Sequence, residues 1–191
     1  VDLATRHQQI IFQNNQMNAP LAGLKVVELA HILPRPWIDQ TSANLGTKVI
    51  KVKPQGGDTR TFGPPFIDSE DDQSAAYFHC TNRKRYSIAS DFGNAADLVK
   101  WEKTIAHSNI LVGNFEVGGL DKFGLNYESQ AENLKLIYCL VTGFGQDGPY
   151  TSHAGYDFLI QMMSGIMSLT GEPDGAPQKK GVAFADIFTG L

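Results

Sequence analysis

A single aspartate, Asp186, stands in an apolar stretch near the end of the sequence, KKGVAFADIFTGL (179–191). Burying a carboxylate that has no partner is strongly unfavourable. The side chain must therefore be exposed, be paired, or be retained for chemistry such as nucleophilic attack. The more common role of such a residue is structural, and here it would be the N-cap of a short helix beginning at Ile187.

A second group of residues has the chemistry to bind anions. The run Asn82–Arg85, NRKR, contains three consecutive cations, and Lys51, Lys53 and Arg60 precede it in the chain. Arginine and lysine are the usual partners of phosphate, so the run is typical of a site for a phosphorylated ligand. The alternative is a solvated face, because both residue types are mostly exposed. His31 also has two interpretations, a general base after a strand or a hydrogen-bonded structural residue.

Short apolar segments alternate with helix-like segments between residues 24 and 144. Strands are predicted for 24–29, 48–52, 85–90, 109–115 and 134–144, and helices for 36–46, 94–108 and 127–134. This alternation predicts an α/β fold, a Rossmann-like and mostly parallel sheet with helices on both faces. Ligands of such sheets bind beyond the carboxyl ends of the strands. The loops expected to carry the site follow Leu29, Val52, Phe115 and Phe144.

The segment 155–171, GYDFLIQMMSGIMSLTG, has the periodicity of one amphipathic helix. The face expected to enter the core carries Tyr156, Leu159, Ile160, Met163 and Met167. The face expected to meet solvent carries Asp157, Gln161, Ser164 and Ser168. This assignment follows from the spacing of three to four residues between neighbours on one helix face.

The composition excludes several classes of protein. The 191 residues carry a net charge of −4, which disfavours a nucleic-acid partner. Cys80 and Cys139 form no CxxC pair, so neither a zinc site nor a disulfide framework is expected, and a reducing compartment is. No run approaches the roughly eighteen apolar residues of a membrane span. Residues 1–19 are interpreted as a flexible arm and residues 20–191 as one domain.

Read in order, six stretches resemble the amino-terminal half of the class III CoA-transferases, the CaiB/BaiF type. They are PLAGLKVVELAHIL, NLGTKVIKVKPQGGDTRTFGPPF, AYFHCTNRKRYSIASDF, LVGNFEVGGLDKFGLNYE, LIYCLVTGFGQDGPY and GYDFLIQMMSGIMSLTGEPDGAPQKKGVAFADIFTGL. The resemblance implies that Asp186, in GVAFAD, is the catalytic nucleophile. It would attack an acyl-CoA to give an anhydride and then an aspartyl-CoA thioester. A coenzyme A thioester is then a substrate, with no permanently bound cofactor and no metal.

The resemblance also implies a substrate pocket and a CoA-binding set. The pocket residues are Tyr156, Asp157, His31 and Leu33, and the CoA-binding residues are Asn82, Arg83, Lys84, Arg85, Asn114 and Arg35. The start of a helix would favour the ionised form of the nucleophile. Arg35 and Glu116 depart from the family pattern, and Glu116 would weaken CoA binding because it places a negative charge near a phosphate.

Tyr156 stands where the related α-methylacyl-CoA racemases have a histidine, and an ordinary tyrosine is a poor base at neutral pH. CoA transfer is therefore favoured over two alternatives, racemisation and a degenerate, non-catalytic relative. The resemblance is greatest to the mitochondrial branch that uses succinyl-CoA and glutarate or a related acid, so an intracellular, mitochondrial or cytoplasmic location is expected. The family implies an interlocked homodimer of longer chains, with a carboxyl-terminal half and a glycine-rich loop beyond residue 191. The 191 residues alone are expected to be inactive.

Overall fold

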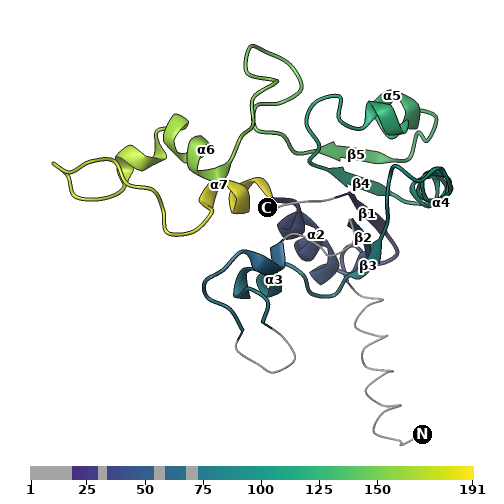
Figure 1. Ribbon diagram of the computed structural model, residues 1–191, viewed down its shortest axis with the longest axis horizontal. Coiled ribbons are helices and arrows are strands. Elements are labelled where there is room, and N and C mark those ends of the chain that lie inside the picture. Colours follow the sequence, from purple (N-terminus) through teal and green to yellow (C-terminus); the bar gives the residue numbers. More distant parts are fainter. Residues whose placement is uncertain (1–18, 30–33, 54–58, 68–72) are drawn as a thin grey trace, which may run out of the picture.

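The computed structural model of the chain describes residues 19–29, 34–53, 59–67 and 73–191 (Figure 1). The predicted arm, apart from residue 19, lies outside the described residues. So do His31 and Leu33, two of the predicted pocket residues. Arg35 is described only as a residue of a helix, without its side chain.

The centre of the fold is a parallel sheet of five strands in the order β3-β2-β1-β4-β5. The strands are β1 (Lys25–Leu29), β2 (Lys48–Lys53), β3 (Tyr86–Ala89), β4 (Ile110–Gly113) and β5 (Ile137–Leu140). Each neighbouring pair is parallel, so the predicted Rossmann-like α/β fold is confirmed. The strand order reverses between β1 and β4, and ligands of open parallel sheets bind at the carboxyl edge beside such a reversal.

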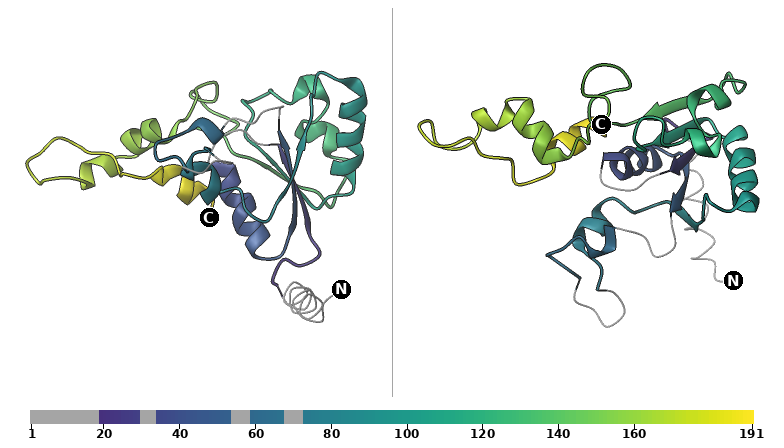
Figure 2. Two further views of the ribbon diagram at one scale, coloured as in Figure 1. Left: turned by 60° about the horizontal axis from the view of Figure 1, so that its bottom comes forward. Right: turned by 45° about the horizontal axis from the view of Figure 1, so that its top comes forward.

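Helices cover both faces of this sheet (Figure 2). Helix α4 (Ala95–Ala106) packs Trp101 and Ile105 against a cluster containing Val27 and Leu29 of β1. Helix α2 (Pro34–Asn44) covers the opposite face, where Ala43 packs against Val26 and Val49. The alternation of Val26 and Val27 between the two clusters follows from the two-residue period of a strand.

Shorter elements lie between the strands and the longer helices along the chain. They are η1 (Thr59–Thr61), α3 (Ala76–Cys80), η2 (Asp121–Phe123) and α5 (Tyr127–Gln130). The helix predicted for 127–134 ends early, at Gln130, because Asn133 accepts a hydrogen bond from the amide of Lys135 and forms a turn before β5. None of the helices in the described part of the chain is long and apolar enough to cross a bilayer.

The last segment projects from the sheet as a separate layer (Figures 1 and 2). It contains α6 (Asp157–Met163), η3 (Ile166–Leu169) and α7 (Phe184–Thr189), and α7 packs against both α6 and α2. The single helix predicted for 155–171 is wrong, because Gly165 adopts a left-handed conformation (φ 78°) that ends the helix.

The predicted faces of this segment are partly wrong, although Ser164 and Ser168 are exposed as predicted. Gln161 is fully buried, whereas Tyr156 is 64% exposed and Met163 is 50% exposed. The periodicity misleads because α6 packs on the polar loop before α7 and not on the apolar core of the sheet.

Candidate functional site

A cleft of about 890 Å³ opens beyond the carboxyl ends of β4 and β5. It is lined by Asn114 and its neighbours after β4, by residues 141–143 after β5, by the loop 148–157 and by α7. Tyr156 and Asp157, from the motif GYDF, and Asp186, from the motif GVAFAD, line its wall together with Asn114. The cleft therefore lies where the loops after Phe115 and Phe144 were expected to form a site.

Asp186 lies in the first turn of α7 and is partly buried. The N-cap of this helix is Ala183, which has no side-chain acceptor for the free amides. The interpretation of Asp186 as an N-cap is therefore wrong, since the helix begins three residues earlier than the apolar run suggested.

Asp157 supplies the acceptor that the N-cap lacks. Its Oδ1 accepts a hydrogen bond from the amide of Ala185 at 2.8 Å and a longer one from the amide of Asp186 at 3.4 Å. The first amides of a helix have no partner within the helix, and a carboxylate also interacts favourably with the positive end of the helix dipole. A residue expected to line the pocket therefore also holds the helix that carries Asp186.

Gln161 fixes Asp157 and the loop before α7 at the same time. Its Nε2 donates to Oδ2 of Asp157 at 2.7 Å and to the carbonyl of Val182 at 3.3 Å, and its Oε1 accepts from the amide of Lys180 at 2.9 Å. A buried amide is stable only when its donors and acceptor are satisfied, as they are here. The residue assigned to solvent thus ties α6 to the segment that leads into Asp186.

The electrostatics of the site differ from the expectation for a helix terminus. Burial, followed by the negative charge of Asp157, raises the pKa of the Asp186 carboxyl from its ordinary 3.8 to about 6. Both effects disfavour the charged form and outweigh the helix dipole. The carboxylate is still mostly ionised at neutral pH, and it is poorly solvated, which suits a nucleophile.

The raised pKa makes a prediction about stability. Below about pH 4 the carboxyl is protonated in the folded and unfolded chain, so its stabilising contribution is fully present. That contribution is lost as the pH rises through the folded-state pKa of about 6. The asparagine of Asp186→Asn cannot ionise. At pH 7.5 we therefore expect the free energy of unfolding of this variant to exceed that of the wild type by about 1 kcal/mol, after allowance for solvent screening, and its unfolding temperature to be higher.

Thermal unfolding of the 191-residue chain between pH 3.5 and 8 measures this difference. The advantage of Asp186→Asn should shrink between pH 6 and pH 4. Equal stability of the two chains at pH 7.5 would contradict the raised pKa.

Tyr77, in α3, is a neighbour of the two carboxylates that sequence reasoning missed, although it is not among the residues that line the cleft. Burial raises the pKa of the Tyr77 hydroxyl, and the negative charges of Asp186, Cys80 and Asp157 raise it further. This hydroxyl therefore lies within the field of the two carboxylates and stays protonated, so it is a potential donor toward them. No local motif marks Tyr77, because its proximity to α7 arises only from the packing of α3.

The loop carrying Tyr156 and Asp157 is held by a close backbone crossing. Gly143, after β5, lies against Gly155 so closely that a Cβ atom on either residue would fall within 3.0 Å of the other backbone. Only glycine allows this approach. The crossing places the start of α6 beside the carboxyl end of β5.

The predicted CoA-binding run does not join this cleft. Among the described residues, the lining includes none of Asn82, Arg83, Lys84 and Arg85. Arg83 and Lys84 are exposed, whereas the Arg85 side chain is only 3% exposed and pairs with Glu28. The lining of the cleft includes Lys122 as a different cation, and it also includes Glu116.

The chain was compared with known proteins. The family model described as CoA-transferase family III matches residues 21–191. Over 177 residues the chain is 51% identical to the succinate–glutarate CoA-transferase of Agrobacterium fabrum, with 90% of this chain and 44% of the relative covered. The succinyl-CoA:glutarate CoA-transferase of Homo sapiens is 38% identical over 175 residues, with 90% and 39% covered. A crystal structure of a CaiB/BaiF family protein from Brucella suis is 59% identical, with a TM-score of 0.86, 91% of this chain and 46% of that chain covered.

The similarity extends over the whole fold and is not confined to one motif. The matched residues include every described element from β1 to α7, and with them the cleft and Asp186. The chain spans less than half the length of these relatives. The resemblance seen in the sequence is confirmed: the chain belongs to CoA-transferase family III.

Proposed function

We propose that this chain carries the nucleophile of an enzyme that moves coenzyme A from an acyl-CoA to a carboxylic acid, with Asp186 as the attacking group. The observation that supports this most directly is a half-buried carboxylate of raised pKa in the wall of a large cleft. Family membership supports the same reaction class. Perturbed carboxylates in clefts are typical of catalytic sites.

The proposed chemistry needs neither a metal nor an external proton donor. An Asp186 oxygen attacks the thioester carbonyl, the C–S bond breaks, and the products are a mixed anhydride and CoA thiolate. The thiolate attacks the aspartyl carbonyl, which releases the donor acid and leaves an aspartyl-CoA thioester. The acceptor carboxylate then displaces the thiolate to form a second anhydride. Attack of the thiolate on the acceptor acyl carbon gives the new acyl-CoA and regenerates the Asp186 carboxylate.

The described residues have distinct roles in this scheme. Asp157 and Gln161 hold α7 and so orient the nucleophile. Asn114 and Lys122 line the same cleft, and we assign both to contacts with the CoA thioester. For the substrates we propose succinyl-CoA and glutarate, the pair named for the Homo sapiens relative.

The racemase alternative is less well supported. Tyr156 lines the cleft at the position where a racemase-like histidine was considered. The cleft also contains His153, but this ring packs against the rings of Phe144 and Tyr150 at centroid distances of 6.4 and 5.4 Å. These edge-on and tilted ring contacts support a packing role for His153 in the 144–153 loop.

The proposed enzyme is an interlocked homodimer that contains further residues beyond this chain. The layer formed by α6, η3 and α7 supports this, because it presents many apolar side chains to solvent. They are Phe158, Met162, Met163, Leu169 and Phe188, each at least 50% exposed. Apolar surface of this kind usually marks an interface.

A transfer assay tests the function. The test protein, called the joined protein, continues the chain after Leu191 with the part of the Agrobacterium fabrum relative that lies beyond the matched region. With succinyl-CoA and glutarate we expect it to form glutaryl-CoA and free succinate, detected by mass spectrometry, and the 191-residue chain alone to form none. Size-exclusion chromatography with light scattering should show the joined protein as a dimer. A joined protein that folds but transfers CoA to none of glutarate, oxalate, malate and mesaconate would refute the proposal.

A further inference from the structure

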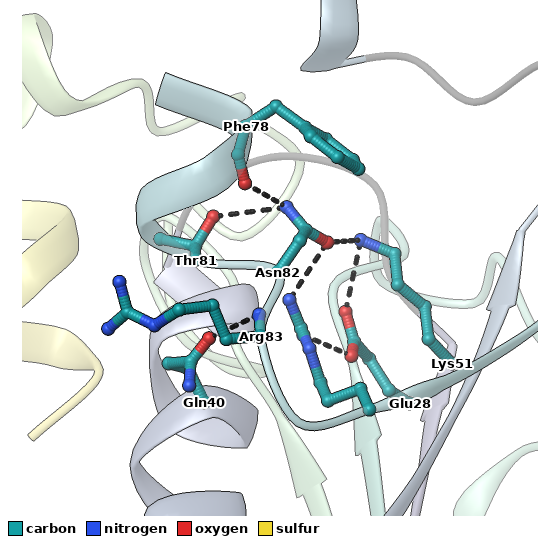
Figure 3. A network of polar contacts seen from close by, with 8 residues as sticks. Glu28, Gln40, Lys51, Phe78, Thr81, Asn82 and Arg83 are labelled. Carbon is teal, nitrogen blue, oxygen red and sulfur yellow. Dashed lines mark hydrogen bonds and ion pairs between the residues drawn. The ribbon is translucent and has the colours of Figure 1, made fainter. Parts of the chain in front are cut away.

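A buried ion network lies on the face of the sheet that α2 covers. Its residues are far from Asp186 in the sequence. Glu28, in the central strand β1, is completely buried, and its carboxylate pairs with Arg85 and, at 3.4 Å, with Lys51 (Figure 3). One acid therefore faces two bases that are themselves nearly inaccessible to solvent. Burying charges is unfavourable unless they are paired, and a buried ion pair is by itself weak evidence of a contribution to stability.

The strand register brings these residues together. Glu28 is the direct neighbour of Lys51 in the β1–β2 pair. The two-residue strand period places Glu28 on the same face as Val26, which packs under α2. Arg85 comes directly before β3 and reaches across β2 to Glu28.

Asn82 connects this network to the turn that contains the basic run. Its Oδ1 accepts from Nη2 of Arg85 at 2.8 Å and from Nζ of Lys51 at 3.2 Å, and its Nδ2 donates to the carbonyl of Phe78 at 2.7 Å (Figure 3). From the other side, Oε1 of Gln40 in α2 accepts from the backbone amide of Arg83 at 2.6 Å. The turn from Thr81 to Arg85 is thus held by β1, β2, α2 and α3.

The conformation of the turn is one that needs such support. Lys84 has a left-handed backbone (φ 57°) although it is not glycine. This conformation costs on the order of 1 kcal/mol and persists where the surroundings impose it. Asn82 and Arg85 point inward as a result, whereas Arg83 and Lys84 are exposed, and Figure 3 shows the Arg83 guanidinium directed away from the network.

We infer that Glu28 is a positioning residue for anion recognition, which acts through Arg85 and Asn82 to hold the turn so that Arg83 and Lys84 face a phosphate-bearing ligand. In the run from Asn82 to Arg85, Asn82 and Arg85 thus have a structural role, whereas Arg83 and Lys84 bind the ligand. The identification of the ligand as CoA rests on the proposed function, but the control of the turn by Glu28 does not.

The test uses the 191-residue chain and two readouts. The single variant Glu28→Gln would leave two buried cations without a carboxylate and is at risk of misfolding. The double variant E28M/R85M removes one charge of each sign, leaves Lys51 as the single cation with its hydrogen bond to Asn82 at 3.2 Å, and fills the space with apolar atoms. Hydrogen exchange of the Arg83 amide reports the turn, titration with CoA reports binding, and K103A, an exposed cation of α4, is the matched control.

We expect E28M/R85M to unfold cooperatively, to exchange the Arg83 amide at least tenfold faster and to bind CoA about tenfold more weakly, whereas K103A changes neither. We expect K84A to weaken CoA binding without accelerating exchange at Arg83. Combining K84A with E28M/R85M should weaken binding by less than the product of the two effects, because both act through Lys84. A purely structural Glu28 would give independent, multiplicative effects.

The possible failures are distinguishable. Unchanged exchange at Arg83 in a folded E28M/R85M chain would overturn the inference about Glu28. If exchange accelerates but R83A and K84A both leave the CoA affinity unchanged, Glu28 controls the turn and the assignment of CoA to the basic run is wrong.

Discussion

Asp186→Asn should lower the rate of CoA transfer by the joined protein by at least about a thousandfold, because asparagine cannot form the acyl anhydride. Asparagine has nearly the same shape as aspartate, so the hydrogen bonds that Asp157 accepts from the amides of Ala185 and Asp186 should survive. The loss should therefore appear in kcat, while the affinity for CoA changes little.

The covalent intermediate gives a second test of the same residue, made on the joined protein with Asp186 intact. Incubation of the joined protein with succinyl-CoA followed by hydroxylamine should modify Asp186, and mass spectrometry of the peptides should locate the product. Asp174→Asn removes an exposed acid from the same projecting segment and serves as the control, with transfer expected at the wild-type rate. Modification at another carboxylate, or normal turnover by Asp186→Asn, would refute the nucleophile assignment.

Gly155→Ala should have the second largest effect, because its Cβ would overlap the backbone of Gly143. A backbone cannot swing aside as a long side chain does, so one of the two segments must shift. The segment from Gly155 leads directly into Tyr156 and Asp157, and a displacement of about 1 Å at a catalytic group lowers rates by about a hundredfold. We expect a loss of that order in kcat, with a loss of about 1–3 kcal/mol in the free energy of unfolding.

Gly181→Ala is the matched control for the stability measurement. Gly181 has an ordinary backbone conformation, and a Cβ atom built there has no other atom within 4 Å. Its unfolding temperature should equal that of the wild type. Wild-type stability and kcat in Gly155→Ala would show that the crossing of Gly143 and Gly155 does not position the site.

The sequence alone was sufficient for the centre of the sheet, because buried parallel strands are marked by short apolar runs that depend little on their surroundings. KVVEL and KVIKV are found as β1 and β2 within a residue of their predicted bounds. The resemblance also selected Asp186, Tyr156, Asp157 and Asn114, which the fold brings into one cleft. These residues could be selected from the sequence because each lies just after a strand or at the start of a helix.

The tertiary structure decided what the individual side chains do. Gln161 and Asp157 have the periodicity of a solvent face, but they are turned inward because α6 packs against the loop before α7 and the free amides of α7 need an acceptor. Arg85 stands in a run typical of exposed cations, but Glu28, placed two strands away by the register of the sheet, draws it into the interior. The pKa of Asp186 depends on burial and on a carboxylate from another helix. Local patterns specify which atoms are available, whereas desolvation and contacts between distant segments act only once the chain has packed.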